Sequence, residues 1–165
     1  MKRLFSPWRM KYIQNHKGSE ATGCIFCSAL NEPDNNENLV VSRGKTAFVL
    51  LNLFPYTCGH MMVAPFAHMA SLDDLEPVGR SEMMELISQC LVVLKKIYEP
   101  QAFNVGANIG EAAGAGVPGH VHLHIVPRWP GDTNFMSTVG EVRVLPESIN
   151  QTYDRILTAW QELYP

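Results

Sequence analysis

A run of three histidines that alternate with apolar residues constrains this 165-residue chain more than any other feature. The run reads His-Val-His-Leu-His-Ile-Val from position 120 to position 126. Successive side chains of a β-strand point to opposite faces, so an extended backbone puts His120, His122 and His124 on one face. We therefore predict a strand over 120–126 that is buried on its apolar face. Its three imidazoles stand in a row, with the outer two about 7 Å apart.

A row of imidazoles on a rigid strand can bind a metal ion, or it can supply a nucleophile with an acid–base partner. Half of the six histidines lie in this run, and the glycine-rich segment 106–119 leads directly into it. Small residues let a ligand approach backbone N–H groups, as in anion-binding nests. The pattern indicates phosphate chemistry, in which one neutral imidazole attacks phosphorus and a second histidine assists the phosphate oxygens or the leaving group.

Length and composition predict one globular domain. The chain has the usual length of a domain, and its 46% hydrophobic and 18% charged residues are typical of globular proteins. No apolar run approaches the ~18 residues of a membrane span, so we expect no membrane partner. The net charge of −3 gives no sign of a nucleic-acid partner. The basic N-terminus lacks the apolar core of a secretory signal, so we expect a cytoplasmic protein.

Hydrophobic periodicity predicts an α+β fold with a mainly antiparallel sheet of five to six strands. We expect a single domain over 1–165, with an N-terminal arm at 1–20 and a C-terminal helix at 148–164. Strands are expected at 39–41, 46–51, 61–64, 103–109, 120–126 and 142–145. A long helix is expected over 78–98, and the polar segment 18–38 is expected to be a loop.

The chain resembles the histidine-triad superfamily, whose signature is His-φ-His-φ-His-φ-φ, where φ is hydrophobic. Positions 120–126 match this signature throughout, and the segment 52–63 is similar to the second block of the family, which ends in Gly-His and a hydrophobic strand. The segments 4–12, 103–106 and 127–135 resemble the bacterial diadenosine tetraphosphate phosphorylase and hydrolase branch. The resemblance implies a histidine-triad fold, and a homodimer with the long helix and a strand at its interface.

The same resemblance implies roles for individual residues. His122 would attack the α-phosphorus of an adenine nucleotide or dinucleoside polyphosphate and form a nucleotidyl-histidine, and His124 would contact the phosphates. Asn52 matches the family position that binds ribose hydroxyls, and Asn108 matches a polar position that contacts phosphate or substrate. The resemblance further implies apolar contact of the base with Leu50. Phe5 and Leu53 are further candidates for that contact.

The loop before the first histidine departs from the family pattern. Several members carry a glutamine or serine there, whereas residues 113–117 of this chain read Ala-Gly-Ala-Gly-Val. Backbone N–H groups can still bind oxyanions, so we expect substrate contacts from Gly114, Ala115, Gly116 and Val117. This loop leaves open whether water or phosphate is the acceptor.

Cys24 and Cys27 form a Cys-x-x-Cys pair, which in a reducing compartment favours metal or redox chemistry over a structural disulfide. The pair supplies half of a tetrahedral zinc site, although its spacing to the histidines is not that of a zinc finger. Two small buried residues or a catalytic disulfide are the alternatives. The resemblance implies that His68 and His120 complete the site, and that the zinc is structural with no open position for substrate.

Other functions remain open at this point. An adenosine phosphoramidase of the same superfamily uses the same nucleophile, and a zinc-stabilised nucleotide-binding or signalling module would bind nucleotides with little turnover. A metallohydrolase with zinc on the triad fits less well, because Leu123 stands where the metallo-β-lactamase pattern has an aspartate. We expect His60 to make structural hydrogen bonds, and Cys58 and Cys90 to be buried apolar residues.

Overall fold

The computed structural model describes residues 23–132, 139–140 and 145–165. The expected arm at 1–20, including Phe5, lies outside the described residues. So does almost all of the strand expected at 142–145.

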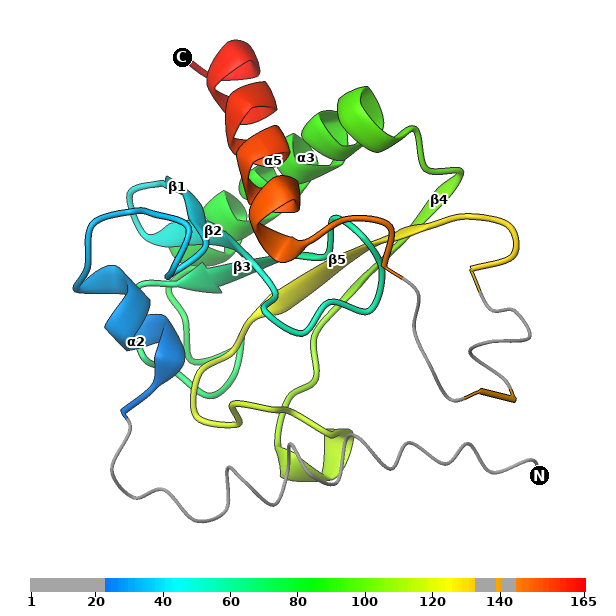
Figure 1. Ribbon diagram of the computed structural model, residues 1–165. Coiled ribbons are helices and arrows are strands. Elements are labelled where there is room, and N and C mark those ends of the chain that lie inside the picture. Colours follow the sequence, from blue (N-terminus) through cyan, green and yellow to red (C-terminus); the bar gives the residue numbers. More distant parts are fainter. Residues whose placement is uncertain (1–22, 133–138, 141–144) are drawn as a thin grey trace.

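The described residues form an antiparallel five-stranded sheet in the order β1-β2-β3-β5-β4 (Figure 1). The strands are β1 (Val40–Arg43), β2 (Ala47–Leu51), β3 (Met61–Pro65), β4 (Ala102–Gly106) and β5 (Leu123–Arg128). The predicted α+β class is therefore confirmed. Adjacent strands pair in register across the centre of the sheet, where Leu50 lies opposite Met62 and Met62 lies opposite His124.

Two helices cover one face of the sheet and a short helix lies on the other (Figure 1). The covering helices are α3 (Pro77–Tyr98) and α5 (Ile149–Leu163), and the short one is α2 (Ile25–Leu30). The expected cap of the last helix is present: Ser148 accepts from the Gln151 N–H, and the Gln151 side chain accepts from the Ser148 N–H. None of the helices in the described part of the chain is long and apolar enough to span a membrane.

The two faces of the sheet belong to two apolar clusters because side chains alternate along each strand. The cluster under α3 and α5 takes Ala47, Val49, Leu51, Met61 and Val63 from the central strands. The cluster beside α2 takes Phe48, Leu50, Met62 and Ala64 from the same strands. Both faces of β2 and β3 are thus buried, which makes the centre of the sheet a rigid support for the neighbouring β5.

Three expectations about local structure were wrong. Part of the loop expected at 18–38 is the helix α2, which at six residues is too short for its periodicity to be recognised in the sequence. The strand expected at 103–109 ends at Gly106. The strand expected at 120–126 begins only at Leu123, because the Val121 N–H bonds to the Met69 carbonyl instead of to a strand. At its other end, the strand continues past Pro127 to Arg128.

Candidate functional site

The three triad histidines share one side of the chain although only His124 lies within β5. Val121 and Ile125 are buried in the cluster under α3 and α5, and the histidine rings turn the other way, toward α2. The ring centroids of His122 and His124 are 4.8 Å apart. The predicted alternation is therefore confirmed, while the backbone that carries the first two histidines is irregular.

One ring nitrogen of His122 forms a hydrogen bond with the backbone. Its Nδ1 atom lies 2.9 Å from the His120 carbonyl oxygen, so Nδ1 carries the proton and donates. The lone pair is then on Nε2. The side chain is only 5% exposed, and burial lowers the pKa of His122. The imidazole is therefore neutral near pH 7 and has the form required of a nucleophile.

His124 is bonded to a histidine from another strand. The Nε2 atom of His60 lies 2.9 Å from Nδ1 of His124, and the Tyr56 N–H donates to Nδ1 of His60. With Nδ1 of His60 accepting, its proton sits on Nε2 and is donated to His124. Nδ1 of His124 then accepts, and its Nε2–H remains a donor. Burial, with a contribution from His122, lowers the pKa of His124 to about 4.

His60 is thus a part of the site that the sequence interpretation placed only among structural hydrogen bonds. It is 1% exposed, and the ring of Tyr56 packs on it with centroids 4.5 Å apart. Its hydrogen bonds agree with the expectation, but their partner is a triad histidine. The sequence signal was its place in the Gly-His block, and nothing in the spacing linked it to a residue 64 positions later.

The expected substrate-binding residues lie at different distances from the triad. The Asn52 amide nitrogen is 3.4 Å from Nδ1 of His60, which brings Asn52 to the edge of the histidine chain. Leu50 is buried on the histidine face of the sheet, two strands away from His124. Asn108 is half-buried after the end of β4, and Leu53 is exposed.

The glycine-rich loop contains a turn of 3₁₀ helix, η1 (Glu111–Ala113). The Gly114 N–H donates to the Glu111 carbonyl, and the Ala115 N–H donates to the Gly110 carbonyl. In this conformation those two N–H groups serve the loop itself. Gly116 and Val117 follow them in the chain, and Pro118 and Gly119 then lead into the triad.

Four predicted metal ligands come together at the N-terminal end of α2: Cys24, Cys27, His68 and His120. Their ligand atoms all lie within 4.8 Å of one another. The Sγ atom of Cys24 is 3.3 Å from Nδ1 of His120, and Sγ of Cys27 is 3.3 Å from Nδ1 of His68. Zinc bonds of about 2.0–2.3 Å in tetrahedral geometry require S–N separations near 3.5 Å, so the four residues fit this metal.

The orientation of His120 also fits a metal ligand. Its Nε2 atom lies 2.9 Å from the Pro65 carbonyl oxygen and donates to it, which leaves the Nδ1 lone pair facing the two sulfurs. A backbone acceptor on the second ring nitrogen is the usual support of a ligating histidine. His120 is fully buried, whereas His68 is exposed.

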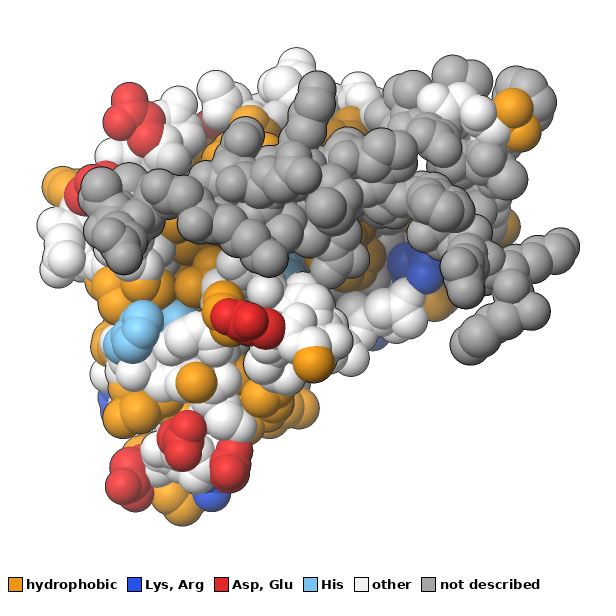
Figure 2. Space-filling view, turned by 90° about the horizontal axis from the view of Figure 1, so that it is seen from below, with side chains coloured by type: hydrophobic (Ala, Val, Ile, Leu, Met, Phe, Trp, Pro, Cys, Tyr) orange, Lys and Arg blue, Asp and Glu red, His pale blue; other side chains and the backbone are white. Residues whose placement is uncertain are grey.

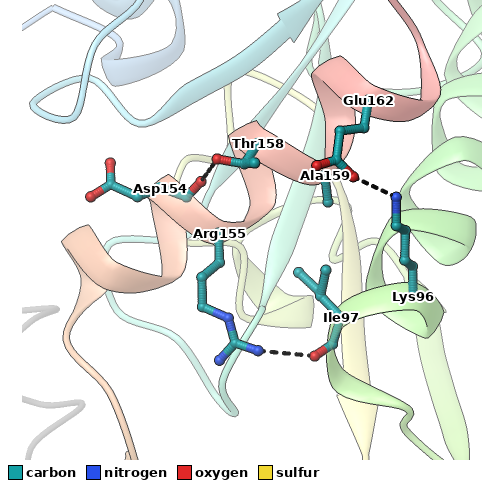
Figure 3. A pocket seen from close by; sticks show the side chains of 7 residues that line it. All are labelled: Lys96, Ile97, Asp154, Arg155, Thr158, Ala159 and Glu162. Carbon is teal, nitrogen blue, oxygen red and sulfur yellow. Dashed lines mark hydrogen bonds and ion pairs between the residues drawn. The ribbon is translucent and has the colours of Figure 1, made fainter.

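The histidine face is distinct from a surface groove lined by α3 and α5. Viewed from below, histidine side chains reach the surface among apolar side chains (Figure 2). The groove instead lies between α3 and α5 (Figure 3). These helices cover the face of the sheet opposite the histidines. There Lys96 pairs with Glu162, and Arg155 donates to the Ile97 carbonyl (Figure 3). Because these charged side chains already have partners on the two helices, we interpret the groove as a contact between helices and not as a second candidate site.

The chain belongs to the HIT domain family, whose model matches residues 33–131. It is 35% identical to the AP-4-A phosphorylase of Mycobacterium tuberculosis, over 97% of this chain and 85% of that protein. It is 34% identical to the asymmetrical bis(5'-nucleosyl)-tetraphosphatase of Schizosaccharomyces pombe, over 56% of this chain and 50% of that protein. The predicted family is therefore confirmed.

Solved structures share the fold. A Zn-bound histidine triad family protein from Mycobacterium smegmatis superposes with a TM-score of 0.68, over 86% of this chain and 95% of that one, at 24% identity. The five-stranded antiparallel sheet with its covering helices is thus a known histidine-triad architecture.

Proposed function

We propose that the protein cleaves diadenosine polyphosphates at an α-phosphorus through a covalent nucleotidyl-histidine on His122, with phosphate as the acceptor. The observation that carries the proposal is the hydrogen bond of His122: its Nδ1–H is bonded to the His120 carbonyl, which puts the lone pair on Nε2. Burial lowers the pKa of His122 and so favours the neutral imidazole. Likeness to an AP-4-A phosphorylase over nearly the whole chain supports both the substrate class and phosphate as acceptor.

In the first step, Nε2 of His122 attacks the α-phosphorus of diadenosine tetraphosphate. A P–N bond forms, the bond from that phosphorus to the bridging oxygen breaks, and ATP leaves with the bond's electron pair. The Nε2–H of His124 faces the same side and donates to a phosphate oxygen, because His60 occupies its other nitrogen. The backbone of Gly116 and Val117 supports the oxyanion, and Asn52 binds the ribose.

In the second step, an oxygen of inorganic phosphate attacks the adenylyl group. The P–N bond breaks, the electron pair returns to Nε2 of His122, and ADP is released. With water as acceptor, the same step would release AMP. The protein supplies one nucleophile and one hydrogen-bond donor, and neither step as proposed uses a metal ion.

We further propose that Cys24, Cys27, His68 and His120 hold a structural zinc ion. When bound, zinc supplies a cross-link between α2 and the segment that precedes β5, with all four positions filled by protein. The fit of the S–N separations supports this metal, and the M. smegmatis neighbour is described as Zn-bound.

We also propose a homodimer. The strand β4 lies at the edge of the five-stranded sheet, with four of its five residues exposed, including Val105. An open edge offers its backbone groups to a second copy of the chain. Sedimentation equilibrium of the wild type and of Val105→Pro tests this, since proline removes a backbone donor from the edge. A monomeric wild type would contradict the homodimer.

Product analysis tests the proposed reaction. The purified protein is incubated with diadenosine tetraphosphate, with and without inorganic phosphate, and nucleotides are separated by chromatography. We expect ADP and ATP only when phosphate is present, and a loss of at least about a thousandfold in kcat for His122→Ala. AMP and ATP without phosphate would make water the acceptor, and full activity of His122→Ala would refute the nucleophile. Preferred cleavage of adenosine phosphoramidate would favour a phosphoramidase.

A further inference from the structure

Phe26 joins the metal cluster to the proposed nucleophile by direct contact. It lies between Cys24 and Cys27 in the sequence and is 1% exposed. Its ring centroid is 5.0 Å from that of His120 and 4.7 Å from that of His122. One side chain therefore touches a candidate metal ligand and the candidate nucleophile at the same time, from a position flanked by two further ligands.

The helix that carries Phe26 is anchored at two ends by different groups. At its C-terminal end, Arg43 donates to the carbonyl oxygens of Ala29 and Leu30 and pairs with Asp34. At its N-terminal end, Cys24 occupies the cap position and provides no side-chain hydrogen bond to the helix. A six-residue helix is not stable by itself, so its first turn depends on the burial of Phe26 in the apolar cluster and on what holds the two cysteines.

His122 needs support on a second side. Its hydrogen bond to the His120 carbonyl fixes Nδ1, and the His124 ring packs edge-on against the imidazole, with ring centroids 4.8 Å apart. The ring of Phe26 also packs against the imidazole, at an interplanar angle of 39°, and further restricts its tilt. In-line attack on phosphorus depends on the direction of the Nε2 lone pair, so a small tilt lowers the rate of the chemical step.

We propose that Phe26 is a positioning residue that transmits the occupancy of the Cys24, Cys27, His68 and His120 metal site to the imidazole of His122. Metal bound to the cysteines fixes the first turn of α2 and with it the Phe26 ring, and loss of the metal releases both. The kinetic part rests on the proposed function of His122, whereas the structural link between metal and imidazole does not. Because Phe26 acts on the orientation of the His122 imidazole, it affects kcat more than KM.

The test combines metal removal with a substitution of Phe26. The wild type and Phe26→Leu are prepared with zinc and after chelation, and each form is assayed with diadenosine tetraphosphate and phosphate. The imidazole signals of His122 are followed in the same samples by ¹⁵N NMR, and zinc content is measured by atomic emission. Phe48→Leu is the matched control, since Phe48 belongs to the same apolar cluster and contacts Phe26, with ring centroids 6.5 Å apart.

In the wild type, we expect zinc removal to lower kcat about tenfold, with KM within about twofold, and to shift the His122 signals. Phe26→Leu should bind one zinc per chain, start with a kcat about tenfold lower, and respond less than about twofold to zinc removal. Phe48→Leu should respond to zinc removal as the wild type does. Phe26→Met, which keeps most of the side-chain volume, replaces Phe26→Leu if the latter does not fold.

Equal responses of the His122 signals to zinc removal in the wild type and in Phe26→Leu would overturn the proposal. So would a normal kcat of zinc-loaded Phe26→Leu. If the wild type does not cleave the dinucleotide at all, the proposed function fails, while the NMR comparison still decides whether Phe26 links the metal site to His122.

Discussion

The Nε2 atom of His60 lies 2.9 Å from the Nδ1 atom of His124, which joins the second block of the sequence to the histidine triad. The backbone N–H of Tyr56 fixes the tautomer of His60 and so aims its proton at His124. The other ring nitrogen of His124, Nε2, then carries a proton, which the proposed reaction uses as a donor to a phosphate oxygen. His60 thereby determines what His124 can do.

Replacing His60 tests this dependence. In His60→Ala, Nδ1 of His124 loses its donor, so its tautomer is no longer fixed and the hydrogen bond to the phosphate weakens. We expect kcat to fall about 10- to 100-fold, with a smaller change in KM. Steady-state kinetics with diadenosine tetraphosphate measure both constants. His60→Gln keeps a donor and should recover part of the loss, whereas a normal kcat for His60→Ala would contradict the role.

The pH dependence of His124 provides a second check. Burial lowers the pKa of His124 to about 4, below the ~6.5 of an unperturbed histidine. Between these values the unfolded chain binds more protons at this position, so His124 lowers stability as the pH falls from 6.5 toward 4. Titration of the imidazole by NMR should show it neutral from pH 8 to pH 5. A midpoint near 6.5 would mean that the ring is not buried as described.

Much of this site follows from the sequence, because the period-two pattern at 120–126 determines which side chains share a face. The pattern did not indicate where β5 begins: Val121 bonds to Met69, a contact between distant segments. The helix α2 was missed because six residues carry no helical periodicity. The link between His60 and His124 depends on the order of β3 and β5 in the sheet, which local patterns do not reveal.

Removal of a metal ligand separates a structural metal from a catalytic one. In Cys24→Ala we expect zinc to be lost and the melting temperature to fall by about 10 °C. Turnover should fall but remain measurable, because no proposed step uses the metal. Atomic emission, calorimetry and the nucleotide assay check the three results. Cys58→Ser, which changes a thiol outside the cluster, should keep its zinc, and complete inactivity of a folded Cys24→Ala would point to a catalytic metal.

Glu147 connects α5 to the turn that carries His60. Its carboxylate accepts from Cys58, Thr152 and Arg155 at 2.9–3.0 Å, and also from Tyr98. Burial raises the pKa of Glu147, but these hydrogen bonds outweigh burial and lower it to about 2. We expect Glu147→Gln to lose about 2 kcal/mol of unfolding free energy at pH 7, measured by urea denaturation.

The difference between the wild type and Glu147→Gln should shrink with acidification. The unfolded carboxyl has a pKa near 4.5, so the stabilisation by Glu147 is complete above that pH and is lost as the pH falls toward 2. Glu162→Gln is the control, because Glu162 forms an exposed pair with Lys96 and should change stability by less than about 0.5 kcal/mol. A stability difference that does not depend on pH would exclude the carboxylate charge as its source.

The covalent intermediate is the central claim, and the intact mass of the protein tests it most directly. The enzyme is mixed with diadenosine tetraphosphate without phosphate, quenched under alkaline denaturing conditions that preserve phosphoramidates, and analysed by mass spectrometry. We predict a gain of one adenylyl group in the intact mass, which digestion places on the peptide that contains His122. The gain disappears when phosphate is added before the quench and is absent from His122→Ala. Turnover without any adenylylated protein, or the same gain in His122→Ala, would contradict the account.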